Sequence, residues 1–137
     1  MSVVEELIRK EGDGSLSFGN YELDSKTKKA DFPYDGASYK IKTFKEITRL
    51  ERNGSMVYES VPGSAVTNFK GDEKGISFNV EAPGDLSFTV ELDEDALYEL
   101  EVDGKSAGSI KTNLGGKLSA SIELDAGVKS LVKITKL

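Results

Sequence analysis

The chain has 137 residues, of which 37% are hydrophobic and 31% charged, a composition typical of a globular domain rather than of a disordered segment. It contains no Cys and no His, which excludes disulfides, catalytic triads that depend on His or Cys, and zinc sites built from those ligands. The formal net charge of −6, from 24 acidic and 18 basic residues, disfavours nucleic-acid binding unless one face is locally basic.

The N-terminal segment, residues 1–10, becomes charged at Glu5 and therefore lacks the apolar core of a signal peptide. No stretch of the chain has enough consecutive apolar residues to span a membrane. We therefore expect a soluble, cytoplasmic protein with no membrane contact.

Residues 22–36 are polar and rich in turn-forming residues, and we interpret them as a long loop. The basic cluster Lys26, Lys28 and Lys29 falls within this segment. Because short runs of like charge are usually solvated, we expect these lysines to be exposed loop residues rather than a nucleic-acid site.

Residues 44–50 give an ambiguous pattern. Phe44, Ile47 and Leu50 recur at helical spacing, but the β-branched residues Ile47 and Thr48 favour a strand. Since an Asn53-Gly54 turn follows closely, we predict a bulged strand for this segment.

Apolar and polar residues alternate with period two along most of the second half of the chain. In residues 86–92, for example, Leu86, Phe88 and Val90 alternate with polar residues, and residues 76–81, 98–102 and 118–124 follow the same pattern. Successive strand residues point to opposite faces, so each segment has one buried and one exposed side. This pattern predicts an all-β protein built as an antiparallel β-sandwich.

Turn signals divide the chain into about ten predicted strands. Asn53-Gly54 and Asp103-Gly104 are typical of tight hairpin turns, because both dipeptides readily adopt positive φ. The last predicted strand, Val128–Thr135, has Lys129, Lys133 and Lys136 in or beside it, which suits an edge strand protected against pairing with other molecules.

We expect residues 1–137 to form a single β-rich domain. The turn around Pro83-Gly84 leaves open an alternative, in which two small sheet units are fused: an N-terminal unit of residues 1–82 and a sandwich-like C-terminal unit of residues 83–137.

Three segments contain residue types that are used in catalysis or metal binding. Asp93, Glu94 and Asp95 could supply two carboxylates for glycan hydrolysis or oxygen ligands for calcium, but neighbouring acidic residues in a turn are usually solvated. Residues 11–14 are a similar acidic turn without the EF-hand spacing, and residues 112–117 lack the phosphate-loop pattern and precede a strand rather than a helix. We therefore predict no catalytic residues, no metal site and no cofactor.

Aromatic residues offer the other route to ligand contact. Four of them fall close together in the sequence, namely Tyr21, Phe32, Tyr34 and Tyr39. Flat rings can stack on sugars, and arginines can bind acidic groups. We predict Tyr34, Tyr39, Arg49 and Arg52 as ligand-binding residues, although Arg49 and Arg52 are three residues apart and would face opposite sides of a regular strand.

Three stretches of the chain resemble small acidic bacterial proteins of about this length, which are often labelled "endosialidase". They are residues 39–54 (YKIKTFKEITRLERNG), residues 57–69 (VYESVPGSAVTNF), and residues 102–105 (VDGK) with 111–119 (KTNLGGKLS). Residues 98–134 also look like the small sandwich domains that are appended to carbohydrate-processing enzymes. The resemblance covers almost the whole chain and implies an activity or affinity directed at acidic glycans.

The sialidase chemistry that this label implies does not fit the residues. Sialidases typically bind the sugar carboxylate with three arginines and carry a Tyr-Glu nucleophile pair on a propeller of several hundred residues. This chain has only Arg9, Arg49 and Arg52, and its length cannot hold a propeller.

The preferred prediction is a non-catalytic binding or assembly module whose partner is a protein or a glycan. A glycan-acting protein is the alternative: a carbohydrate-binding module, or a hydrolase with its site around Asp93, Glu94, Tyr34 and Arg49. Self-association into a homo-oligomer through exposed apolar surface is a third hypothesis.

Overall fold

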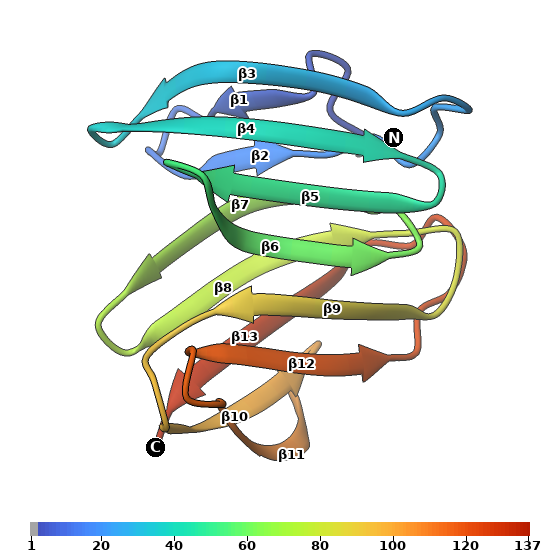
Figure 1. The fold of residues 1–137 in the computed structure, drawn as a ribbon. Helices are drawn as coiled ribbons and strands as arrows, with labels where there is room; N and C mark the ends of the chain where they lie inside the picture. The colour runs from blue at the N-terminus through green and yellow to red at the C-terminus, as the bar shows by residue number, and fades with distance from the viewer. Residues whose placement is uncertain (1–2) are drawn as a thin grey trace.

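The computed structural model describes residues 3–137, so Met1 and Ser2 of the charged N-terminal segment lie outside it. Within the described range, thirteen strands and no helix form two antiparallel sheets that pack face to face (Figure 1). This arrangement confirms the predicted antiparallel β-sandwich. Residues 3–137 contain no helix that could cross a membrane.

One sheet has seven strands and the other has six. In spatial order the seven-stranded sheet contains β1 (Ile8–Lys10), β2 (Leu16–Phe18), β7 (Ala65–Asp72), β8 (Gly75–Glu81), β13 (Ser130–Lys136), β10 (Leu97–Val102) and β11 (Lys105–Lys111). The six-stranded sheet contains β12 (Lys117–Ile122), β9 (Leu86–Glu91), β6 (Ser55–Val61), β5 (Ile47–Arg52), β4 (Ala37–Phe44) and β3 (Thr27–Tyr34). Both sheets therefore include strands from either side of residue 82.

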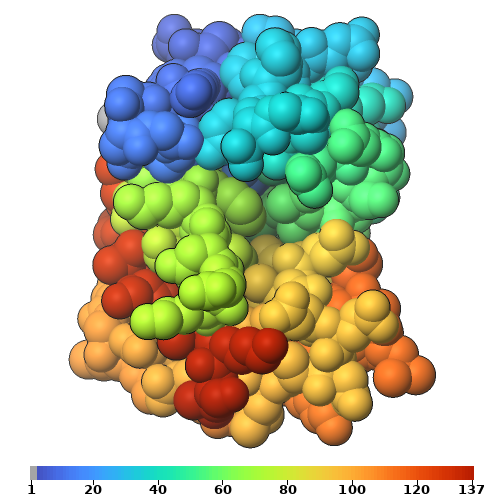
Figure 2. All heavy atoms as spheres, turned by 90° about the vertical axis from the view of Figure 1, so that its left-hand side faces the viewer, coloured from blue at the N-terminus to red at the C-terminus, as the bar shows by residue number. Residues whose placement is uncertain are grey.

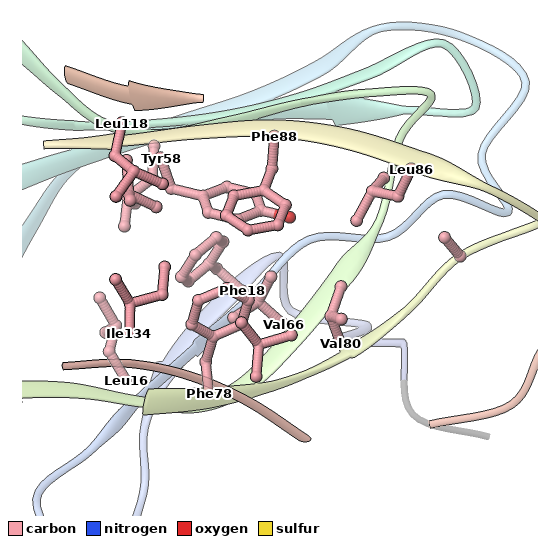
Figure 3. Packing of buried hydrophobic residues seen from close by; sticks show 14 of the residues in the cluster. Leu16, Phe18, Tyr58, Val66, Phe78, Val80, Leu86, Phe88, Leu118 and Ile134 are labelled. Atoms are coloured by element: carbon pink, nitrogen blue, oxygen red, sulfur yellow. The ribbon is translucent and has the colours of Figure 1, made fainter. Parts of the chain in front are cut away.

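The core lies between the sheets and is rich in aromatic side chains. In Figure 3, side chains from the two sheets point toward one another, with Tyr58, Leu86, Phe88 and Leu118 on one side and Phe18, Phe78, Val80 and Ile134 on the other. The rings of Tyr58 and Phe88 stack with centroids 6.3 Å apart, and Phe18 meets Tyr58 edge-on at 5.4 Å. Alternation in the sequence places these residues on the inner faces, as the period-two pattern predicts.

Both predicted hairpin turns are confirmed, and a third was missed. Asn53-Gly54 and Asp103-Gly104 have positive φ at both residues and connect β5 to β6 and β10 to β11. Asp35-Gly36 has the same conformation, with φ of 49° and 75°, and connects β3 to β4. The prediction of a loop over residues 22–36 is therefore wrong for β3, whose largely exposed residues give this edge strand the polar composition of a loop.

Two further predictions are wrong, namely the bulged strand over residues 44–50 and the edge position of the last strand. Residues 44–50 form the end of β4, a turn at Lys45-Glu46 and the start of β5, rather than one bulged strand. Their helical spacing arises because Phe44 and Ile47 lie opposite each other across this hairpin.

The last strand, β13, lies between β8 and β10 rather than at an edge. Val132 and Ile134 face the core, while Lys133 lies on the opposite, solvent-facing side, directly across from Glu101. Lys133 therefore marks the outer face of a central strand, and not an unpaired edge.

Candidate functional site

A cleft of about 390 Å³ opens at one end of the sandwich. The β1–β2 turn, the β3–β4 hairpin and the end of β7 surround it. Its lining residues are Lys10, Asp13, Gly14, Leu16, Tyr34, Asp35, Tyr39, Phe69, Lys70 and Gly71. Figure 2 looks onto this end of the molecule, where the blue, cyan and lime-green segments meet.

The β3–β4 hairpin places two tyrosine rings in the cleft. The Asp35-Gly36 turn pairs Tyr34 with Ala37 and Phe32 with Tyr39, which brings the rings of Tyr34 and Tyr39 into edge-to-face contact at 5.4 Å. The Tyr34 hydroxyl donates a hydrogen bond of 2.6 Å to the carbonyl oxygen of Gly14 in the β1–β2 turn. This bond ties together hairpins from different sheets and holds the Tyr34 ring in place.

Charged side chains of both signs join the aromatic and apolar residues around the cleft. Leu16 and Phe69 provide apolar surface, and Lys10, Lys70, Asp13 and Asp35 provide charge. The Asp13 carboxylate accepts hydrogen bonds from the Ser15 hydroxyl at 2.5 Å and the Ser15 backbone N–H at 3.0 Å. These bonds, with a smaller contribution from the charge of Lys70, lower the pKa of Asp13 and keep it ionised.

Both cleft tyrosines are neutral hydrogen-bonding groups at ordinary pH. Burial raises the pKa of Tyr34, and the negative charges of Asp35 and Asp13 raise it further. Burial also raises the pKa of Tyr39, an effect that the nearby positive charge of Arg52 partly offsets. Neither phenol is therefore activated as a nucleophile, which would require a lowered pKa or an adjacent base.

The structure separates the four predicted ligand-binding residues. Tyr34 and Tyr39 both line the cleft, and Arg52 lies beside it, directly across from Tyr39 in the β4–β5 pair. Arg49 lies on the outer face of the six-stranded sheet, where its Nε is 2.8 Å from Glu51 and its Nη1 is 2.6 Å from Glu59. Arg49 and Arg52 thus occupy different places, as their spacing predicts.

The acidic turn considered for hydrolysis is not part of the cleft. Asp93 pairs with Lys136 at 2.9 Å and Asp95 with Lys111 at 3.1 Å, and all three acidic residues of the turn are exposed. The structure therefore does not place Asp93 or Glu94 with Tyr34 in this cleft, and it places Arg49 elsewhere. Among residues 3–137 no group of three potential metal ligands is close enough to hold an ion.

Sequence reasoning missed most of the residues that surround the cleft. They come from other parts of the chain than β3 and β4: Lys10, Asp13 and Leu16 from the β1–β2 hairpin, and Phe69 and Lys70 from β7. Asp35 could have been found, because the Asp-Gly dipeptide between two aromatic segments is a strong hairpin signal.

Comparison of the chain with protein-family models, with curated proteins and with solved structures gives no match.

Proposed function

We propose that this protein is a non-catalytic binding module and that its ligand, a hydroxyl-rich ring compound such as a sugar, occupies the cleft at the end of the sandwich. The observation that carries the proposal is the combination in one cleft of aromatic surface with acceptors and donors of hydrogen bonds. Sugar rings have apolar C–H faces, which pack on aromatic groups. They also have hydroxyls, which form hydrogen bonds with carboxylates and ammonium groups. A volume of about 390 Å³ falls in the range of small-molecule sites.

Binding is favoured over hydrolysis by the electrostatics of the acidic residues. A glycosidase needs a carboxylic acid whose pKa is raised so that it can protonate the leaving group. In the cleft, the hydrogen bonds from Ser15 lower the pKa of Asp13, which is the opposite of what a general acid requires. A glycan-hydrolysing function remains the second proposal, and sialylated sugars belong in the test because of the sequence resemblance.

The test is a thermal-shift screen of the wild-type protein against neutral and sialylated oligosaccharides. A ligand at a hundred times its dissociation constant adds about 2.7 kcal/mol of stability, which raises the melting temperature by several degrees. We expect Lys10→Gln and Asp35→Asn each to weaken that shift, because each removes a charged partner. Asp35 has positive φ, which Asn tolerates, so the turn itself is retained.

Asp103→Asn is the matched control, since Asp103 also precedes Gly in a hairpin turn, with φ of 52°, but does not line the cleft. It should leave the ligand-induced shift unchanged. The proposal fails if no sugar in the panel changes the melting temperature, or if both cleft variants respond as the wild type does. Sugar cleavage by the wild-type protein would establish the hydrolytic alternative instead.

A further inference from the structure

One row of cations on the outer face of the six-stranded sheet lies in unfavourable register. Lys28 on β3 is directly opposite Lys42 on β4, which in turn is directly opposite Arg49 on β5. Like charges placed opposite each other across strands are destabilising. Lys42 therefore lies between two cations in a protein whose net charge is −6.

The other pairs of charged residues that lie directly opposite each other in the sheets combine a positive with a negative charge. Wherever else two charged residues are register partners within residues 3–137, their signs are opposite: Lys40 with Glu51, Arg49 with Glu59, Lys117 with Glu91, and Lys133 with Glu101. Violations of a locally favoured pattern are expected at functional sites, where a binding role compensates for the lost stability. The row Lys28–Lys42–Arg49 is such a violation.

These cations surround a small depression. A pocket of about 50 Å³ is lined by Lys28, Lys40, Lys42, Arg49 and Glu51, and we call it the lysine notch. Arg49 is held by its two ion pairs with Glu51 and Glu59, so its guanidinium is fixed at one side of the notch. Within residues 3–137, no carboxylate oxygen lies at ion-pair distance from the ammonium groups of the three lysines.

We propose that Lys28, Lys40 and Lys42 form a binding site for an oxyanion, namely the phosphate, sulfate or carboxylate group of a ligand, seated in the lysine notch. Each ammonium group supplies up to three hydrogen-bond donors and a positive charge, and a bound anion would remove the repulsion within the row. Arg49 is a positioning residue: its Nε donates to Glu51 and its Nη1 to Glu59, and these bonds fix its positive charge beside the notch.

The surroundings of the notch limit the ligand to an isolated anionic group. A volume of about 50 Å³ exceeds the share of about 30 Å³ that one water molecule occupies in the liquid, so the notch accommodates a compact group. Glu51, which lines the notch, Glu59 and the negative net charge of the chain oppose a long, uniformly charged polyanion. The site is separate from the cleft and does not depend on the function proposed for it.

The test compares the melting temperatures of wild type and Lys42→Gln in sodium phosphate, sulfate, acetate and chloride at matched ionic strength. We expect at least one oxyanion to stabilise the wild type relative to chloride, and Lys42→Gln to lose that stabilisation. The salt that acts identifies whether phosphate, sulfate or carboxylate is preferred.

Lys133→Gln is the matched control, since Lys133 is also a strand lysine but faces Glu101. It should keep the oxyanion response. The proposal is overturned if wild type and Lys42→Gln respond equally to every oxyanion, or if no oxyanion exceeds chloride in its effect on the wild type.

Discussion

At the scale of single residues, the core is held by a network of buried hydroxyl groups as well as by apolar contacts. The oxygen atoms of Tyr58 and Ser60 lie 2.8 Å and 2.7 Å from the Ser64 hydroxyl, and all three residues are buried. The Thr48 hydroxyl donates a bond of 3.0 Å to the Ser64 carbonyl oxygen. Buried polar groups stabilise a fold only when they are paired, so this network should be sensitive to the loss of one member.

We expect Ser64→Ala to lower the free energy of unfolding by about 1–3 kcal/mol, because it removes the Ser64 hydroxyl to which the buried Tyr58 hydroxyl is hydrogen-bonded. Ser121→Ala is the control: its hydroxyl is also hydrogen-bonded, to Ser87 at 2.9 Å, but it is exposed. Its effect should stay within about 0.5 kcal/mol. Urea denaturation of both variants measures their free energies of unfolding. Equal decreases in the two variants would show that burial does not determine how much stability is lost with the hydroxyl.

Burial also makes stability depend on pH at Tyr58. Burial raises the pKa of Tyr58 from its ordinary value of 10.0 to about 12. Above pH 10 the unfolded chain loses a phenolic proton that the folded chain retains, so stability falls as the pH rises toward 12. The loss attributable to Tyr58 should reach about 2–3 kcal/mol.

Tyr58→Phe isolates this contribution, since the other titrating groups are unchanged. Between about pH 10 and pH 12, we expect the unfolding free energy of the wild type to fall by about 2–3 kcal/mol more than that of Tyr58→Phe. Denaturant titrations at several pH values measure it. Parallel pH profiles for the two proteins would contradict the assignment to Tyr58.

At the scale of elements, the position of a strand within its sheet determines how tightly its backbone is held. Strand β13 pairs with β8 on one side and β10 on the other, whereas β11 pairs only with β10 and is almost entirely exposed. We expect hydrogen-bonded amides of β13 to exchange with solvent more slowly than those of β11 by a factor of ~100 or more. Hydrogen-exchange NMR measures both sets, and similar protection would contradict the observed strand order.

At the scale of the whole molecule, the two sheets should unfold together. Strand β9 pairs with β6 and β13 pairs with β8, so hydrogen-bonded ladders connect the segments on either side of residue 82. We expect residues 83–137 produced alone to be unfolded by circular dichroism, and the full chain to melt in one transition. A folded fragment of residues 83–137, or two separate transitions, would instead support two fused sheet units.

Much of the fold could be predicted from local sequence. Alternation in segments such as residues 86–91 shows which side chains are buried, because successive strand residues point to opposite faces. Asn53-Gly54 and Asp103-Gly104 mark hairpins because their residues tolerate positive φ. The exposed edge strand β3 could not be recognised in this way, since it buries too little surface to require an apolar pattern.

The sequence by itself therefore determined the class of structure, an antiparallel sandwich, and the absence of His and Cys chemistry. Only the tertiary structure decided that β13 is central, that Tyr34 and Tyr39 share a cleft with Lys10 and Phe69, and that Arg49 lies on another face. The physical reason is that alternation and turn residues act over a few neighbours, and their signals are therefore local. Strand order depends on pairings between distant segments, which are settled when the apolar faces of the whole chain are buried together.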